Sequence, residues 1–278
     1  DSTWSSHTKS SVFASVGYSE VDAQALDGTR IDAIDRSREV EYRLRIDVRR
    51  QHTPAGDIVA GLAVKAVQFD YELLANGVWT PYEVKSRNIR ATSRQSFADV
   101  AGFAELTRPM FSRGRVSAGM RLDRFGASGA VEGSPRVEAE FVPSDRTRLI
   151  GYWGIYRQSV PYIWMASAPG NLGLAPISSR QGGGGLEVEI RRGLRAGIEA
   201  FDKRYRDYPV DPVVPGRVLI SAAADFESPY VGPLVGGGQV HARGVDAVAT
   251  AALGSRLQLA TNYSYWRVSQ RGLDLVWR

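Results

Sequence analysis

The sequence predicts an all-β protein, an antiparallel up-and-down transmembrane β-barrel that is present only in part. Three observations carry this prediction. Apolar and charged residues alternate along several segments, the strictest of them, residues 39–49, exceeds the roughly 5–6 residues usual in globular sheets, and short turns alternate with long loops. A strand that spans a membrane needs about 9–11 residues, with apolar side chains facing lipid and polar side chains facing the interior.

The clearest alternation runs through residues 39–49, EVEYRLRIDVR. Apolar or aromatic residues fill every second position, and charged residues fill all the others. Successive side chains of a strand point to opposite faces, so one face of this segment is apolar and the other is charged. A helix would scatter the same residues around its circumference. The segment is therefore predicted to be a strand with lipid on one side and a polar interior on the other.

Other segments repeat the pattern less strictly. Residues 115–123, 136–141, 186–191, 194–200, 245–251 and 257–266 also alternate, and residues 11–18 are rich in β-branched and aromatic side chains. Residues 58–66 carry one apolar face, but Val67, Phe69 and Tyr71 continue on the other phase. This change indicates either a β-bulge near Ala66 or a different environment towards the end of the strand.

The connections between these segments fall into two length classes. Short turns are expected at 51–57, 143–146, 192–193 and 253–255, and long loops at 75–94, 159–185 and 208–241. Loops are also expected at 20–37 and 126–135. Because short turns flank every long loop, the long loops should gather at one end of the barrel, as in outer-membrane barrels. We count about eleven or twelve strands of spanning length, in a single domain over residues 1–278.

Composition excludes several classes of protein. The 278 residues include no cysteine, so disulfides and thiolate metal sites are excluded. The net charge of +5 is modest, and the charges are interleaved along strands, so no nucleic-acid partner is expected. No apolar run approaches the roughly 18–20 residues of a membrane helix.

The motifs of catalysis and cofactor binding are also missing. The three histidines are far apart, which predicts no metal site, and the glycines at 182–185 lack the context of a phosphate loop and are expected at a flexible loop end. Glu187 and Glu189 share a strand face, where arginines on neighbouring strands would pair with them. We therefore expect no enzyme, no catalytic residues and no cofactor.

Three segments carry a family resemblance. They are residues 141–158, FVPSDRTRLIGYWGIYRQ, residues 184–205, and residues 238–246 with 263–267. Together they resemble the β-barrel of TonB-dependent outer-membrane receptors, which enclose a plug in 22 strands. The chain shows no recognisable plug, TonB box or terminal aromatic strand. It is thus expected to be a barrel segment truncated at both ends.

The resemblance implies a role in the bacterial outer membrane. It implies active transport of a scarce large solute of the siderophore, cobalamin or saccharide class. The partners would be outer-membrane lipid, the solute, and a TonB-type energy-coupling protein acting through a plug domain not present in this chain. Two alternatives remain open: another outer-membrane barrel, such as a porin or barrel enzyme, and a soluble all-β binding module.

Candidate solute contacts lie in two of the long loops, which would be extracellular. Aromatic and arginine side chains are frequent anchors in recognition sites. The candidates are Trp79, Tyr82 and Arg87 in one loop, and Arg157, Tyr162, Trp164 and Asn171 in or beside another. The alternative for each is that it packs its own loop.

Overall fold

The computed structural model describes residues 2–5, 8–27, 30–53, 55–76, 88–213, 215, 218–219, 232–253 and 257–277. Its strands form one sheet in sequence order, and every neighbouring pair is antiparallel. The strands are β1 (Ser2–Ser5), β2 (Thr8–Asp27), β3 (Arg30–Thr53), β4 (Gly56–Ala75), β5 (Ile89–Met110), β6 (Gly114–Arg124), β7 (Val131–Ser144), β8 (Thr147–Gln158), β9 (Ile177–Arg191), β10 (Leu194–Val210), β11 (Val235–Leu253) and β12 (Leu257–Arg271). The predicted up-and-down fold and strand number are confirmed.

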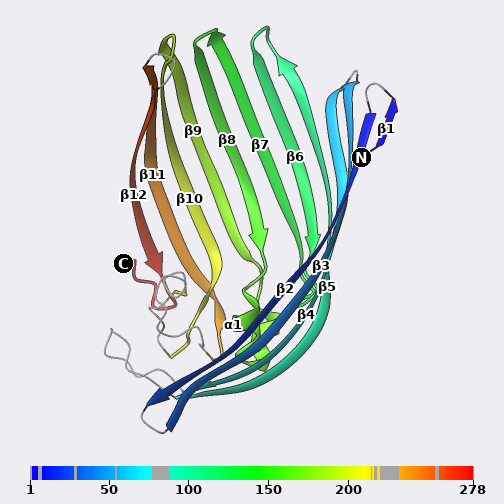
Figure 1. Cartoon of the computed structure of the whole chain (residues 1–278), viewed down its shortest axis with the longest axis vertical. Helices are drawn as coiled ribbons and strands as arrows, with labels where there is room; N and C mark the ends of the chain where they lie inside the picture. The colour runs from blue at the N-terminus through cyan, green and yellow to red at the C-terminus, as the bar shows by residue number, and fades with distance from the viewer. Residues whose placement is uncertain are drawn as a thin grey trace.

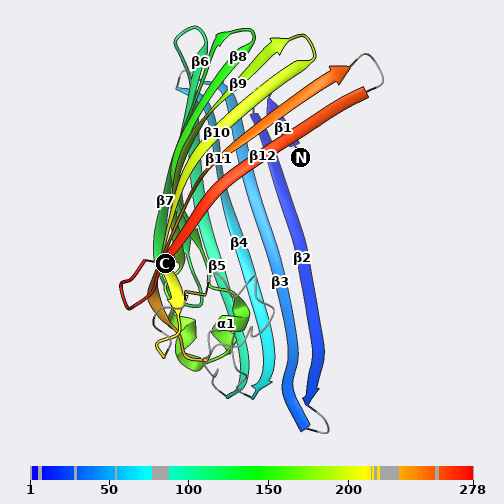
Figure 2. The ribbon, with the colours of Figure 1, turned by 90° about the vertical axis from the view of Figure 1, so that its left-hand side faces the viewer.

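The sheet is strongly curved and open. Figure 1 shows it as a trough, with β2 near one margin and β12 at the other, and Figure 2 shows the two margins apart. Within the described residues, β12 pairs only with β11, so the sheet does not close. This is the geometry of part of a larger barrel. Among the same residues, no helix has both the length and the apolar character needed to cross a membrane.

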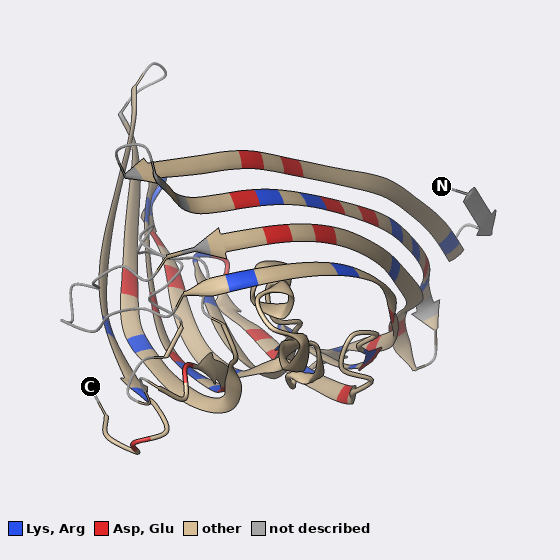
Figure 3. Ribbon diagram, turned by 90° about the horizontal axis from the view of Figure 1, so that it is seen from below, with Lys and Arg blue, Asp and Glu red and all other residues tan. Residues whose placement is uncertain are grey.

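The concave face of the trough holds the short helix α1 (Tyr162–Ala166) and the 3₁₀ turn η1 (Pro169–Gly173). Figure 3 shows the sheet curving around them. We call this concave face the inner face. Glu41 of β3 contacts α1 there, and the alternation then turns Tyr42 and Leu44 outwards. Their side chains are 51% and 45% exposed, which suits contact with lipid.

The connections separate by length in part, since β2 ends at Asp27 and β3 begins at Arg30, which leaves a connection of two residues at the same end as the long loops. The described turns at 145–146 and 192–193 join strands at one end, whereas the connections that follow Ala75, Gln158 and Val210 leave the sheet at the other. In outer-membrane barrels the short turns are periplasmic and the long loops extracellular. The end that holds α1 is therefore the extracellular end.

Two of the expected loops are strands instead. Residues 20–27 extend β2 and residues 30–37 extend β3, and the two strands pair from Glu20–Arg38 to Asp27–Arg30. Their polar character reflects a strand that continues beyond the apolar band, which sequence alone does not separate from a loop. Residues 182–185 lie inside β9, paired with β8 and β10, and are not a flexible loop end. The glycine at position 183 leaves space for the Tyr152 side chain, because a Cβ on Gly183 would lie 2.6 Å from the Tyr152 hydroxyl oxygen.

The change of phase in β4 reflects a change in the surroundings of the strand and not a β-bulge. The pairing of β4 with β5 is regular throughout, and its single irregularity with β3 lies between Arg50 and Thr53, far from Ala66. Val67, Phe69, Tyr71 and Leu73 all point inwards and are almost fully buried. The loop that carries α1 covers them, so the inner wall is apolar at this end of β4.

Candidate functional site

The β8–β9 connection folds back against the inner wall. Tyr162, the first residue of α1, places its ring 5.7 Å from the Phe69 ring in a stacked arrangement and 6.1 Å from the Phe97 ring. Trp164, Met165 and Ala166 are buried in the same cluster. A helix of five residues is too short to be stable alone, so this packing holds it in place.

Asn171 holds the rest of the β8–β9 connection in place through hydrogen bonds. Its amide nitrogen donates to the carbonyl oxygens of Trp164 at 2.7 Å and Gly232 at 2.9 Å, and its side-chain oxygen accepts from the backbone nitrogen of Leu234 at 2.9 Å. The side chain is 1% exposed. Because these bonds reach Gly232 and Leu234, Asn171 ties the β8–β9 connection to the β10–β11 connection.

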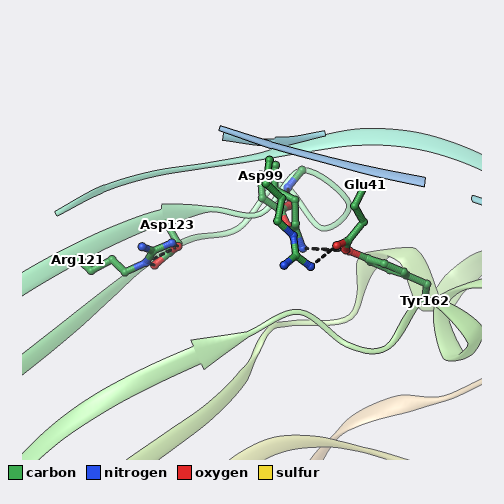
Figure 4. A network of polar contacts seen from close by, with 8 residues as sticks. Glu41, Asp99, Arg121, Asp123 and Tyr162 are labelled. Atoms are coloured by element: carbon green, nitrogen blue, oxygen red, sulfur yellow. Dashed lines mark hydrogen bonds and ion pairs between the residues drawn. The ribbon is translucent and has the colours of Figure 1, made fainter. Parts of the chain in front are cut away.

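A polar network joins α1 to β3, β4 and β5 (Figure 4). The Tyr162 hydroxyl donates to Glu41 and accepts from the Lys65 ammonium group at 3.0 Å. Lys65 also pairs with Asp99 at 3.0 Å, and the second oxygen of Asp99 accepts from the backbone nitrogen of Gly126 at 2.8 Å. The network therefore runs without a break from the β3 wall to the start of the β6–β7 connection.

Tyr162 acts in this network as a neutral hydroxyl. Burial raises the pKa of its phenol, and the hydrogen bond to Glu41 raises that pKa further. The hydroxyl thus stays protonated at neutral pH and keeps donating to the carboxylate. Its ring also lies 5.5 Å from the Lys65 nitrogen, which adds a cation–π contact.

Next to this network the inner wall encloses an open hollow of about 850 Å³. Its charged lining alternates in sign and is largely paired. Arg45 pairs with Asp47 at 2.8 Å and Arg121 with Asp123 at 2.7 Å. The lining is made by Glu39, Glu41, Arg43, Leu44, Arg45, Ala63, Val64, Lys65, Asp99, Val100, Ala101, Arg121, Asp123, Phe125, Arg157, Gln158, Ser159, Val160, Pro161, Tyr162 and Ile163. Such a wall can hold a large polar solute through many weak contacts.

The structure separates the predicted site residues into three groups. Tyr162 and Arg157 line the hollow, and Arg157 pairs with Glu132 at 3.2 Å. Trp164 and Asn171 are buried inside the loop, where they fill the packing role left open as an alternative. Trp79, Tyr82 and Arg87 lie outside the described residues.

Lys65, Asp99 and the role of Glu41 were not predicted from the sequence. These residues come from three strands and meet only because β3, β4 and β5 are neighbours. One signal was present, since Lys65 is the only charged residue between positions 58 and 69. The expected partners of Glu187 and Glu189 are confirmed. Arg148 lies 3.3 Å from Glu187, and Arg195 lies 3.7 Å from Glu189.

Comparison with known families decides the class of this barrel. The family model described as "TonB dependent receptor-like, beta-barrel" matches residues 1–275. The chain belongs to this family. The family's barrels are proteins of the bacterial outer membrane, which gives this chain its location and rejects the soluble binding module. Among curated proteins, none matches the chain significantly.

Solved structures share the fold at low identity. FpvA of P. aeruginosa, bound to a pyoverdine, is 11% identical, with a TM-score of 0.68 over 96% of this chain and 39% of FpvA. The ferric enterobactin receptor PfeA of Pseudomonas aeruginosa is 13% identical, with a TM-score of 0.67 over 96% and 45%. The copper transporter OprC is 13% identical, with a TM-score of 0.65 over 94% and 44%. The chain therefore spans less than half the length of each of these three proteins.

Proposed function

We propose that this chain forms part of the wall of a TonB-dependent active transporter for a scarce large solute of the siderophore, cobalamin or saccharide class. One observation carries the proposal. A loop is tethered inside the barrel beside a polar hollow of about 850 Å³, and ligand pockets usually measure about 300–1,000 Å³. The structural likeness to pyoverdine and enterobactin receptors supports the same class of solute.

A transporter of this kind needs an external source of energy and leaves its solute chemically unchanged. Transport would be driven by a TonB-type protein acting through a plug domain supplied outside residues 1–278. The hollow would bind and release its solute unchanged, as a transporter does and an enzyme does not. Lipid would surround the outer face, where Leu44 and Leu62 are exposed.

Within the hollow, we assign solute contact to Arg157 and Tyr162. Arg157 is held in place by its ion pair with Glu132, and about 20% of its side chain stays exposed. A guanidinium held in this way can donate charge-assisted hydrogen bonds to a solute oxygen. Trp79, Tyr82 and Arg87 remain predicted contacts from the connection that follows Ala75.

Uptake measurements on the complete protein test this function. Cells that produce it are expected to accumulate a radiolabelled ferric siderophore, cobalamin or oligosaccharide, and to stop when the TonB-type protein is deleted or a protonophore is added. Uptake that continues without TonB and depends only on solute size would reject the proposal and indicate a porin. Conversion of the solute at the cell surface would reject it in favour of a barrel enzyme.

Binding measurements then test the assigned contacts. Arg157→Gln should weaken binding of the transported solute about tenfold, as expected for a central arginine anchor. The matched control is Arg195→Gln, because Arg195 also forms an inner-face ion pair but lies at the periplasmic end. Equal effects of the two variants would contradict the assignment of Arg157 while leaving the transport function standing.

A further inference from the structure

Two register rows on β8–β12 bring distant arginines together. The first row runs Trp153, Gly182, Asp202, Arg243 and Arg267 across the five strands. The second row runs Ile155, Arg180, Arg204, His241 and Ser269, two residues nearer the extracellular end. We call Arg180, Arg204, Arg243 and Arg267 the outer arginine cluster. They are spread over 88 positions of the sequence, yet they occupy adjacent rows of one sheet.

The cluster faces outwards. Glu187 of β9 meets Arg148 on the inner face, so Arg180, seven residues away along the same strand, points to the other side. Arg204 pairs directly with Arg180, and Arg243 directly with Arg267, so all four side chains share the outer face. All four are exposed.

The cluster is short of negative charge. Asp202 is the carboxylate within the two rows, and it serves both Arg204 at 3.0 Å and His241 at 2.6 Å. Arg180 lies over the Trp153 ring at 5.6 Å, and among the described residues Arg180, Arg243 and Arg267 form no ion pair with a carboxylate. Like charges directly opposite each other on paired strands are destabilising. An external anion bound to the two arginine pairs would therefore reduce this repulsion.

The position of the cluster identifies the kind of anion. The next outer rows towards the periplasmic end are apolar or aromatic. One contains Gly184, Ala200, Val245 and Tyr265, and the following one contains Leu186, Ile198, Ala247 and Tyr263. Rows two residues apart are separated by about 7 Å. The arginines thus begin where the lipid-facing band ends, at the level of the headgroups in the extracellular leaflet.

We propose that the outer arginine cluster is a binding site for the phosphate groups of an anionic lipid in the extracellular leaflet. Arginine forms bidentate bonds to phosphate, and basic residues at a membrane surface attract anionic headgroups. The cluster extends over β9 to β12, which is about 14 Å at the usual strand spacing. That width exceeds one phosphate and fits a headgroup with two. The acyl chains would lie on the apolar rows below.

The test uses the complete protein, purified and freed of lipid, and lipid A that carries both phosphates as the probe. Native mass spectrometry measures its retention and affinity. Each arginine near a membrane surface contributes enough that its loss weakens binding about fivefold, so Arg243→Gln with Arg267→Gln should weaken it about 25-fold. Replacing both with lysine should restore most of the binding. Lipid A without phosphates should bind no better to the natural protein than to the double variant.

The matched control is Arg124→Gln. Arg124 is also exposed on the outer face at the extracellular end, but its register partners are Val100 and Val131 and not arginines. It should leave lipid binding unchanged. A heat-dependent shift in gel mobility checks that each barrel is folded, and Arg180→Gln alone provides a milder variant. Equal loss in the control, full binding by the folded double variant, or preference for an acidic protein over lipid A would overturn the proposal.

Discussion

Strands β3 and β4 are neighbours, but their inner faces differ. Towards the extracellular end β3 presents Glu39 and Glu41, whereas β4 presents Phe69, Tyr71 and Leu73 beside them. The difference depends on whether the loop that carries α1 covers the strand. Where the loop covers the wall, inward side chains are apolar and buried, and where the wall faces the hollow they are charged and paired. An inward apolar row in such a barrel therefore marks the place where a loop docks.

The largest expected effect comes from the covered part of β4. Phe69→Ala should destabilise the docked loop by about 3–5 kcal/mol, because it removes the ring under Tyr162 and leaves a cavity. Hydrogen exchange of the amides of Trp164, Met165 and Ser167 measures this, since all three are hydrogen-bonded within the loop. Phe103→Ala is the control, because Phe103 lies under Arg45 and away from α1. Slow exchange that survives Phe69→Ala would refute the docking argument.

The next effect contrasts the two faces of β3. Leu44→Arg places a charge against lipid near the middle of the outer apolar row and should cost about 2–4 kcal/mol. Arg43→Leu should cost less than about 1 kcal/mol, because Arg43 is an exposed pair partner of Glu41 on a wet wall. Urea unfolding from lipid vesicles measures both. Equal costs would mean that both faces pack against protein.

A smaller effect concerns the link between two connections. Asn171→Ala should destabilise the docked loop by about 1–3 kcal/mol, because the carbonyl of Trp164 and the backbone nitrogen of Leu234 lose their partner. The change should speed amide exchange at Leu234 as well as in α1. Asn262→Ala serves as the control, since Asn262 is exposed on β12. Exchange that rises in α1 alone would show that the two connections are independent.

The smallest effect is at the hydroxyl of Tyr162. Tyr162→Phe should destabilise the loop by about 1 kcal/mol, because the ring keeps its contacts while Glu41 keeps Arg43 and Lys65. The same exchange measurement applies, with Tyr162→Ala as the comparison that also removes the ring. A loss from Tyr162→Phe as large as that from Phe69→Ala would place the main tether in the polar network and not in the apolar contact.

Much of the fold could be predicted because alternation along a strand is a local property. Residues 39–49 determine both faces of β3 without any knowledge of their neighbours. The site could not be predicted in the same way. Glu41, Lys65 and Tyr162 are brought together by strand order and by the inward path of the loop, and neither leaves a local pattern.

The outer arginine cluster also separates what is visible locally in the sequence from what depends on strand pairing. The sequence spaces its arginines so widely that the charges look evenly interleaved, while the register gathers them into two rows. The sequence alone determined most of the strands, their two faces and the transmembrane-barrel architecture, because side-chain period and strand length act over about ten residues. The tertiary structure decided where the inner wall is covered and which charges meet, because those depend on pairing between strands far apart in the chain.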